Sequence, residues 1–441
     1  MRGILDKFVI HGGRPLRGAV RVHGSKNAAL PMMAASLLLP RGERLVLRNV
    51  PDLADVRTMA RLLAELGVAV ERHGARLTLT VDDDRPVRAP YEIVKTMRAS
   101  ICVLGPLLAR RGEAQVSFPG GCAIGSRPVD LHLKGLARLH AKLAVRNGYI
   151  LARGSKLRGG TVYLGGTFGS TVTGTDNILM AAVLAKGRTV IEHAAQEPEV
   201  QELAHLLNRM GARIEGIGNH RLIVQGVDRL RGAEKTVIPD RIEAGTFMAA
   251  AAITGGDVTV ENVRAEDLTV VLETLRQMGV RLEAGTYTVR VNARGLRRAD
   301  PVDITSLPYP GFPTDLQAQF MAILTRAKGI SVVTERIYPD RFTHAAELSR
   351  MGAEIRKQES TAIIHGVPKL SGAPVMASDL RAGAGLVVAG LAARGRTEVL
   401  RVYHIDRGYD KLEERLSALG ANIRRAKEIA PASTVPAAAT A

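Results

Sequence analysis

Cysteine and aromatic side chains are scarce in this chain of 441 residues. It has two cysteines and no tryptophan, and aromatic residues make up 3% of the sequence. Two cysteines cannot supply the disulfide framework of a small secreted domain, so we expect a reducing compartment. So few aromatic rings also leave little stacking surface for single-stranded nucleic acid. These shortages exclude a disulfide-stapled fold and disfavour a base-stacking protein.

Long apolar runs and the common nucleotide-binding loops are missing as well. The longest apolar stretch, residues 28–39, is too short to cross a bilayer, and the charged first eight residues do not form a signal peptide. No Gly-x-Gly-x-x-Gly motif follows a strand-like run, and there is no Walker loop. His132, His344 and His404 lack metal-ligand spacing. We therefore expect a cytoplasmic protein that uses no membrane, no metal and no cofactor.

Positive charge is in clear excess. The chain has 61 lysines and arginines against 43 aspartates and glutamates, which gives a formal net charge of +18. Such an excess attracts nucleic acid or small anions. The arginines are spread along the chain rather than gathered in one block, which favours small anionic substrates and makes nucleic acid an unlikely partner. Nucleic-acid binding stays an alternative that a salt-dependent mobility shift would support.

One sequence pattern is repeated six times with a period of roughly 70 residues. Each copy has a valine-rich run, an amphipathic segment that ends in a Leu-Gly or Met-Gly step, and two further strand-like runs. Glycine suits the position after a helix because a left-handed conformation costs it least. Five copies carry this step clearly, and a weaker sixth copy starts at Gly112; the five glycines are Gly67, Gly211, Gly279, Gly352 and Gly420.

Each unit also contains a second helix that is apolar and small on nearly every face, as expected of buried helices. These segments are residues 27–39, 97–109, 177–185, 242–254, 316–325 and 381–393. The pattern predicts an α/β fold of two inside-out α/β barrel domains, each made of three repeated β-α-β-β-α units with buried helices.

The unit count also predicts the domain boundaries. Residues 24–237 form one three-unit domain with the Cys122 loop, and residues 1–23 together with 238–429 form the other. The two chain crossings then lie at nearly one place, where they make a hinge. Residues 430–441 are of low complexity and are expected to be disordered.

Basic residues stand where several buried helices begin. Helix N-termini attract phosphates and carboxylates, whereas lysine and arginine gain nothing from the helix dipole there. We therefore predict ligand binding for Lys26, Arg98, Arg241 and Arg381. The polar residues beside them also fit a simpler role as helix caps or salt-bridge partners; these are Thr175, Asp240 and Asp379.

Two residues are candidates for proton transfer. Cys122 lies in a glycine-rich loop five residues before Arg127, a setting that favours a thiolate, although a loop cysteine of no consequence is an equal interpretation of the residue alone. Cys102, in an apolar run, is expected to be a small buried hydrophobe. Asp315 is a lone carboxylate among cations, a poor anion binder but a plausible general base.

Four motifs together resemble a known family. They are the Cys122 loop and the segments Ser25-Lys-Asn-Ala-Ala-Leu-Pro31, Pro308-Tyr-Pro-Gly-Phe-Pro-Thr-Asp-Leu-Gln-Ala-Gln319 and Asp379-Leu-Arg-Ala-Gly-Ala384. From about residue 6 to 425 the chain resembles the enolpyruvyl transferase family, and within it the UDP-N-acetylglucosamine 1-carboxyvinyltransferases. The resemblance implies transfer of enolpyruvyl from phosphoenolpyruvate to the 3′-hydroxyl of UDP-N-acetylglucosamine with release of phosphate. It also implies a role in peptidoglycan synthesis and sensitivity to fosfomycin.

The resemblance also implies roles for individual residues. Cys122 would be the general acid and Asp315 the base, while Asn27 would hold the sugar. Lys26, Arg127 and Arg407 would hold the phosphate and carboxylate, with Arg98 and Arg381 beside them. The residues implied to contact the uridine diphosphate are Arg127, Pro128, Val129, Asp130, Leu131 and Ile337; Arg241 and Asp379 complete the predicted substrate-binding set.

Three other functions stay open from the sequence. A paralogous transferase could use another uridine nucleotide, and the sister transferase that acts on shikimate 3-phosphate has the same fold. That sister enzyme needs no thiol, so the Cys122 loop argues against it. An inactive basic descendant that binds nucleic acid is disfavoured because Lys26, Cys122, Asp315, Arg381 and Arg407 are all present. The sequence leaves the oligomeric state open.

Overall fold

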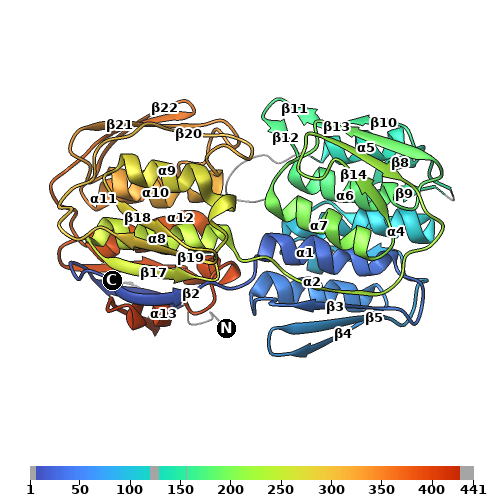
Figure 1. Cartoon of the computed structure of the whole chain (residues 1–441), viewed down its shortest axis with the longest axis horizontal. Coiled ribbons are helices and arrows are strands. Elements are labelled where there is room, and N and C mark those ends of the chain that lie inside the picture. Colours follow the sequence, from blue (N-terminus) through green and yellow to red (C-terminus); the bar gives the residue numbers. More distant parts are fainter. Residues whose placement is uncertain (1–5, 120–128, 155, 428–441) are drawn as a thin grey trace, which may run out of the picture.

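The described chain forms two halves of similar construction that lie side by side (Figure 1). The computed structural model describes residues 6–119, 129–154 and 156–427, so Cys122, Arg127 and Pro128 lie outside the described residues. One half has a hydrophobic core built from residues 28–238. The other has a separate core built from residues 8–22 and 242–423. We propose that these halves are the two predicted domains, and the separate cores support that division.

Three four-stranded sheets enclose the N-terminal half. Their strand orders are β16-β3-β5-β4, β6-β7-β9-β8 and β10-β13-β15-β14. The strands are β3 (Arg44–Arg48), β4 (Val68–His73), β5 (Arg76–Val81), β6 (Arg88–Ala89), β7 (Glu113–Ser117), β8 (Lys142–Arg146), β9 (Tyr149–Arg153), β10 (Thr161–Tyr163), β13 (Arg188–Glu192), β14 (Arg213–Glu215), β15 (Arg221–Gln225) and β16 (Ala233–Thr236). A small hairpin of β11 (Gly165–Gly166) and β12 (Gly169–Ser170) stands apart from these sheets.

Three further sheets enclose the C-terminal half, in the orders β24-β25-β1-β26, β18-β19-β17-β2 and β20-β21-β23-β22. The strands are β1 (Asp6–His11), β2 (Arg17–Arg21), β17 (Asp257–Glu261), β18 (Arg281–Ala284), β19 (Thr288–Asn292), β20 (Ile304–Ser306), β21 (Ile330–Glu335), β22 (Glu354–Gln358), β23 (Thr361–His365), β24 (Pro374–Met376), β25 (Arg396–Leu400) and β26 (Asn422–Lys427). The first two strands of the chain thus belong to sheets of the C-terminal half.

Each sheet contains one strand that the repeat pattern did not include. A short strand before each buried helix pairs in parallel with its neighbour, as β16 does with β3, while the remaining pairs are antiparallel. Apart from β2, these strands have only two to four residues, too few to show alternating polarity. Within the described residues, the six sheets are separate rather than closed into a continuous barrel.

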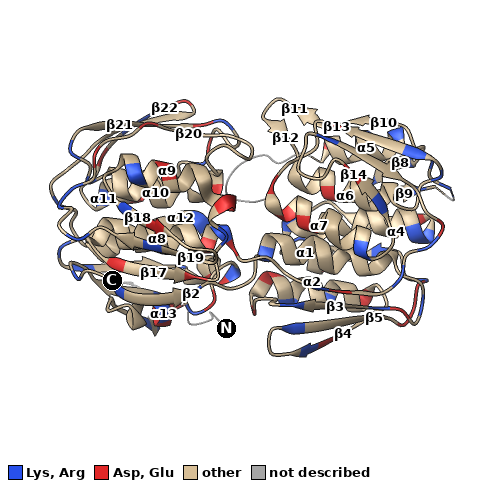
Figure 2. Cartoon of the chain, viewed as in Figure 1, with Lys and Arg blue, Asp and Glu red and all other residues tan. Residues whose placement is uncertain are grey.

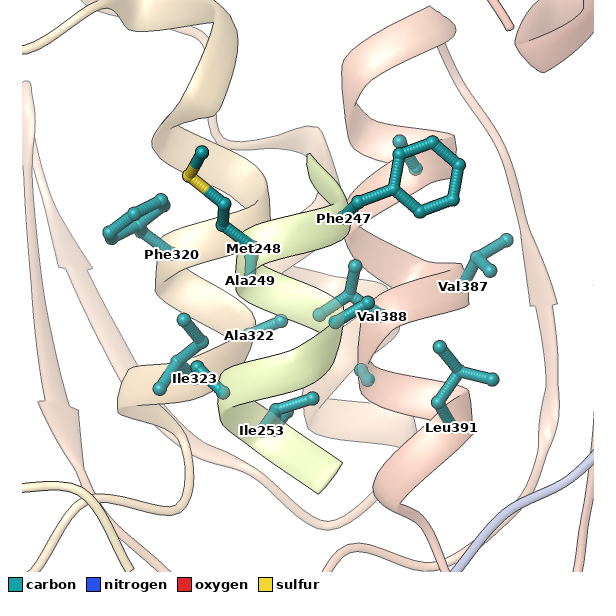
Figure 3. Close-up of a cluster of buried hydrophobic side chains, with 14 of the residues drawn as sticks. Phe247, Met248, Ala249, Ile253, Phe320, Ala322, Ile323, Val387, Val388 and Leu391 are labelled. Atoms are coloured by element: carbon teal, nitrogen blue, oxygen red, sulfur yellow. The ribbon is translucent and has the colours of Figure 1, made fainter. Parts of the chain in front are cut away.

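The six predicted buried helices are confirmed, and they lie inside the sheets. The helices are α1 (Lys26–Ala34), α4 (Leu104–Arg111), α6 (Val172–Ala182), α8 (Arg241–Thr254), α10 (Gln317–Leu324) and α12 (Leu380–Ala392). In the C-terminal half, α8, α10 and α12 lie side by side, and Phe247, Phe320 and Val387 belong to the hydrophobic cluster that surrounds them (Figure 3). A Cβ at Gly385 would lie 2.8 Å from the Ala318 carbonyl oxygen, so glycine permits this close approach. The inside-out arrangement therefore follows from the apolar helices.

A second set of helices is amphipathic and ends as predicted. These helices are α2 (Ala54–Glu65), α5 (Asp130–Arg138), α7 (Pro198–Arg209), α9 (Thr269–Gln277), α11 (Thr343–Arg350) and α13 (Leu412–Ala418). The glycines of the five clear steps all have positive φ, between 79° and 107°. After α5, His140 takes this place with φ 66°, which explains why that copy lacks the glycine step.

The chain passes between the halves twice, and the two crossings are hydrogen-bonded to each other. Gly24 and Pro239 form an antiparallel bridge. The Ser25 N–H donates to the Ile238 carbonyl at 2.7 Å, and the Asp240 N–H donates to the His23 carbonyl at 2.8 Å. These crossings lead directly into α1 and α8, so they set how two buried helices of opposite halves begin.

In the described part of the chain, no helix combines the length and apolarity needed to cross a membrane.

We predict that Gly24→Ala destabilises the protein through this crossing. An added Cβ would overlap the backbone carbonyl oxygen of Asn49, whose side-chain amide donates to the Val237 carbonyl at 3.0 Å in the neighbouring crossing. The expected loss is about 1 to 3 kcal/mol, measured from the midpoint of urea-induced unfolding. In the control Gly329→Ala, the new methyl meets Pro301 at an ordinary 3.4 Å. Equal midpoints for the two variants would contradict the prediction.

Candidate active site

A large cleft of about 1120 Å³ opens between the two halves. The N-terminal half contributes residues from α1, α5, α6 and the β11–β12 hairpin, and the C-terminal half contributes the start of α8 and several loops. Charged residues of both signs lie on helix ends that face one another across this gap (Figure 2). The volume is slightly above the usual range for small-molecule pockets, so it has room for two substrates.

The cleft brings together most of the predicted site residues. Those that line it are Lys26, Asn27, Arg98, Asp130, Leu131, Arg241, Asp315, Ile337, Asp379, Arg381 and Arg407. Val129 is instead 5% exposed and packs into the core of the N-terminal half. Because residues 120–128 are outside the described residues, the positions of Cys122, Arg127 and Pro128 relative to the cleft stay predictions.

The first charged cluster joins the two halves through Asp55, a residue that the sequence analysis missed. Asp55 lies in the first turn of α2 and is 5% exposed. One carboxylate oxygen accepts from Lys26 Nζ at 3.0 Å, and the other accepts from Arg407 Nε at 3.0 Å. Lys26 belongs to the N-terminal half, while Arg407 lies in a 3₁₀ helix of the C-terminal half, η5 (Val402–Arg407). One carboxylate thus holds two cations from opposite walls.

The charge state of Asp55 follows from these two partners. Burial alone would raise the pKa of the carboxyl, but Lys26 and Arg407 outweigh it and lower the pKa below its ordinary value. Asp55 is therefore ionised at neutral pH. The cluster carries two positive charges and one negative charge, which leaves one net positive charge for an anionic ligand.

The second charged cluster surrounds Asp315. Arg341 Nη1 donates to one carboxylate oxygen at 2.8 Å, and Arg381 donates to the other through Nε at 3.1 Å. A second Arg381 nitrogen, Nη2, lies 3.0 Å from that same oxygen. Arg341 and Arg381 are 6% and 2% exposed, whereas 28% of the Asp315 side chain is exposed toward solvent. The carboxylate thus faces the cleft with its two arginines behind it.

The two arginines control the basicity of Asp315. Burial would raise the pKa of this carboxyl, but Arg381 and then Arg341 overcome it and hold the pKa well below the ordinary range. Without a ligand, Asp315 is consequently a firmly ionised and weak base. Any ligand anion that draws either arginine away would raise its pKa and make it a better proton acceptor.

The helix α12 positions Arg381 at the edge of the cleft. Asp379 caps this helix, and one of its oxygens accepts from the backbone N–H groups of Arg381 at 2.8 Å and Ala382 at 3.1 Å. The capping interpretation of Asp379 is therefore confirmed, as is that of Asp240, which accepts from two backbone N–H groups of α8. Whether Asp379 also touches a substrate stays a prediction.

Arg241 is held by a carboxylate rather than left open to a ligand. Its guanidinium donates to both oxygens of Glu199, at 3.0 and 3.2 Å, and both residues are buried. It also lies over the Tyr309 ring, 5.6 Å from its centre, so it connects the start of α8 to the loop before Asp315. This geometry gives Arg241 a clear structural role, and ligand binding by Arg241 stays a prediction.

The buried Asn177 amide determines which nitrogen of His132 carries the proton. The Gly105 N–H donates to Asn177 Oδ1 at 2.8 Å, so the amide nitrogen, 2.9 Å from His132 Nδ1, is the donor there. The proton of neutral His132 is then on Nε2, which lies 3.3 Å from Thr173 Oγ1. Burial lowers the pKa of His132 to about 3, so the ring is neutral. His132 is thus no cation for phosphate.

Two further acids lie in the wall near α6. Asp176 is 2% exposed, and its Oδ1 has no hydrogen-bond partner among the described residues. Burial raises the pKa of Asp176 and also that of Glu197. Cys102 lies in this region too; it is fully buried, and burial raises the pKa of its thiol, which confirms the interpretation as a small buried hydrophobe.

Sequence reasoning missed the partners of the predicted cations. Asp55 has the pattern of an ordinary helix N-terminal acid, and Arg341 is one arginine among many. Neither stands at a spacing that links it to Lys26 or Asp315, since the contacts join residues 29 and 26 positions apart. Within the described residues, no group of three or more histidine, cysteine, aspartate or glutamate side chains could hold a metal ion.

We predict that Asp55→Asn destabilises the protein most strongly at neutral pH. Removing a buried carboxylate leaves Lys26 without its partner, and such losses cost about 3 kcal/mol or more. Because the folded-state pKa of Asp55 is lowered, its contribution is present above the ordinary carboxyl pKa and is lost as the pH falls through the lowered value.

The difference in unfolding midpoint between Asp55→Asn and wild type should therefore shrink below about pH 4. Asp52→Asn is the matched control, because Asp52 pairs with Arg57 at 2.7 Å but both side chains are more than half exposed. The control should change stability by less than about 1 kcal/mol. A difference for Asp55→Asn that is equal at pH 7 and pH 3 would refute the assignment.

Comparison with known proteins identifies the family. The profile of the family described as EPSP synthase (3-phosphoshikimate 1-carboxyvinyltransferase) matches residues 10–416. The enolpyruvyl transferase NikO from Streptomyces tendae is 24% identical, with a TM-score of 0.87 over 97% of this chain and 100% of NikO. Two structures of EPSP synthase from Acinetobacter baumannii, each 20% identical, have TM-scores of 0.73 and 0.71 over 96% and 95% of this chain and 100% and 99% of theirs. At these identities the structures show the shared fold. The family match covers most of the chain, which therefore belongs to the EPSP synthase family of enolpyruvyl transferases.

Proposed function

We propose that the protein transfers enolpyruvyl from phosphoenolpyruvate to the 3′-hydroxyl of UDP-N-acetylglucosamine and releases phosphate. The observation that carries the proposal is the pair of charged clusters in one cleft, a cation-rich cluster at Asp55 and a cleft-facing carboxylate at Asp315. This transfer needs cationic residues that bind the anionic groups of the substrates, and a general base that takes the proton of the attacking hydroxyl.

We propose that Lys26 and Arg407 bind the phosphate and carboxylate of phosphoenolpyruvate. They stand on opposite walls and are already drawn together by Asp55. An anion bound between them adds attraction across the cleft, so substrate binding favours closure of the two halves. Closure also excludes water, which protects the reaction intermediate from hydrolysis.

Asp315 is the proposed base for the acceptor hydroxyl. As the hydroxyl oxygen attacks C2 of phosphoenolpyruvate, Asp315 takes its proton while an acid delivers a proton to C3. The conjugate base of that acid then takes a C3 proton back, the C2=C3 double bond re-forms as the bond from C2 to the phosphate oxygen breaks, and the enol ether product and phosphate are released. Cys122 remains the proposed acid, on the strength of the sequence resemblance. Arg381 and Arg341 stabilise negative charge that develops beside the base.

A nucleotide sugar is the proposed acceptor because of the size and lining of the cleft. The volume of about 1120 Å³ exceeds what phosphoenolpyruvate alone needs. Asn27, Leu131 and Ile337, for which the resemblance implies contacts with the sugar or the uridine diphosphate, all line it. The same volume and lining also leave room for another uridine nucleotide, the alternative acceptor that the sequence left open.

The first test is release of phosphate from phosphoenolpyruvate with each acceptor in turn. We expect release with UDP-N-acetylglucosamine and none with shikimate 3-phosphate, measured under identical conditions. Release only with another uridine nucleotide would select the alternative acceptor. Release with shikimate 3-phosphate alone would overturn the proposal.

We predict that Asp315→Asn strongly slows turnover while the protein still binds phosphoenolpyruvate. Loss of a general base lowers kcat by about 10²- to 10⁴-fold, whereas the cations at Asp55 remain in place. The control Asp300→Asn removes a half-exposed carboxylate that pairs with exposed Lys328, and it should retain wild-type kcat. Unchanged kcat in Asp315→Asn would exclude Asp315 as the base.

A further inference from the structure

The hydroxyl of Tyr409 lies at the centre of a buried hydrogen-bond network behind Asp315. Tyr409 is 1% exposed. Its oxygen lies 3.1 Å from Arg381 Nη1, 2.8 Å from Thr246 Oγ1 and 3.2 Å from Gln319 Nε2. These partners come from α12, α8 and α10, the three buried helices of the C-terminal half (Figure 3).

The hydrogen bonds that Tyr409 makes with Thr246 and with Arg381 can be assigned a direction. Thr246 donates its only hydroxyl proton to the Ile242 carbonyl at 2.9 Å, so toward Tyr409 its oxygen can only accept. Tyr409 therefore donates to Thr246, and its oxygen accepts from Arg381, which can only donate. Gln319 Nε2 has two protons for three acceptors, the Asp315 carbonyl and Thr246 Oγ1 at 3.1 Å and the Tyr409 oxygen at 3.2 Å.

Arg381 is consequently held at two edges of its planar guanidinium. Nε and Nη2 face Asp315, and Nη1 donates to Tyr409. Its central carbon also lies 5.5 Å from the centre of the Tyr409 ring. A guanidinium bound at one edge can still swing about its stem, whereas one bound at two edges has a single orientation. Tyr409 thus fixes the orientation of the Arg381 guanidinium relative to the Asp315 carboxylate.

The same tyrosine connects this arrangement to the opposite wall of the cleft. Only Gly408 separates it from Arg407, which bonds to Asp55 of the N-terminal half. A Cβ at Gly408 would lie 2.7 Å from Leu380 Cδ1, so glycine lets this segment pass close to the start of α12. Residues 407–409 therefore join the contact between the halves to the arginine that controls the proposed base.

We propose that Tyr409 is a positioning residue for the transferase reaction: its hydroxyl orients Arg381 against Asp315 and couples that pair to the Arg407–Asp55 contact across the cleft. The inference rests on the proposed role of Asp315 as base. Arg381 is the largest of the attractive influences that lower the pKa of Asp315. When the hydroxyl is removed and Arg381 loosens, the pKa of Asp315 should rise toward its ordinary value.

The test is Tyr409→Phe, which keeps the ring and removes only the hydroxyl, beside the control Tyr287→Phe, whose side chain is 61% exposed. We expect kcat to fall about tenfold, the size of a lost hydrogen bond to a charged group. The KM for phosphoenolpyruvate should change less than about twofold, because Lys26 and Arg407 keep their partner Asp55. The acid limb of the pH profile of kcat/KM should move to higher pH. The control should match wild type in all three measurements.

A second variant and a measurement without substrate distinguish a failure of the inference on Tyr409 from a failure of the proposed function. Thr246→Val removes the acceptor of the Tyr409 hydroxyl and should shift the acid limb in the same direction. In the ligand-free protein, Asp315 stabilises the fold above its unfolded pKa, and this contribution is lost as the pH falls through its lowered folded-state pKa. The acid-induced fall in Tm should therefore be smaller in Tyr409→Phe than in Tyr287→Phe, because the folded-state pKa of Asp315 then lies closer to its unfolded value.

Each outcome bears on one claim. If wild type releases no phosphate with any acceptor, the proposed function fails, and the acid dependence of Tm still decides whether Tyr409 orients Arg381. If wild type is active and Tyr409→Phe has the same kcat, pH profile and acid dependence of Tm as the control, the inference on Tyr409 is wrong. If Tyr409→Phe does not fold, an unshifted acid limb in Thr246→Val refutes it.

Discussion

The organisation of the cleft depends on the need to neutralise buried positive charge. Lys26, Arg341 and Arg381 are each less than a tenth exposed, and an unpaired cation at such depth would be very costly. Asp55 and Asp315 meet this need by serving two cations each. With two positive charges for every carboxylate, each cluster keeps a net positive charge. The same arrangement that makes burial tolerable therefore leaves the cleft attractive to anions.

The exchange of strands between the halves explains how both walls reach the same cleft. β2 completes a sheet of the C-terminal half and then leads to α1, whereas β16 completes a sheet of the N-terminal half and then leads to α8. The paired crossings at Gly24 and Pro239 bring the starts of these two helices together. Because Lys26 and Arg241 stand at the starts of these two helices, the connection between the halves also places these two residues in the cleft.

Much of the fold could be predicted from the sequence because its main signals are local. The six apolar segments became six buried helices, and the Leu-Gly and Met-Gly steps became helix ends with positive φ. The short parallel strands were missed because two to four residues carry no periodicity. Predicted cations such as Lys26 and Arg381 do line the cleft, but their carboxylate partners were not foreseen. Ion pairs between distant segments depend on tertiary packing and leave no mark in spacing.

In the ligand-free cleft, Asp55 lies where we expect a substrate anion to bind. Its carboxylate occupies the space between Lys26 and Arg407, where the phosphate or carboxylate of a substrate would also be most stable. A bound anion must then either share these cations with Asp55 or displace it, and both choices weaken the Asp55 contacts. Arg407 is joined through Gly408 to Tyr409, which is hydrogen-bonded to Arg381. Movement of Arg407 on anion binding can thus be passed to Arg381 and from there to Asp315. A substrate anion and Asp55 therefore compete for Lys26 and Arg407, and the outcome of that competition also affects the pKa of Asp315.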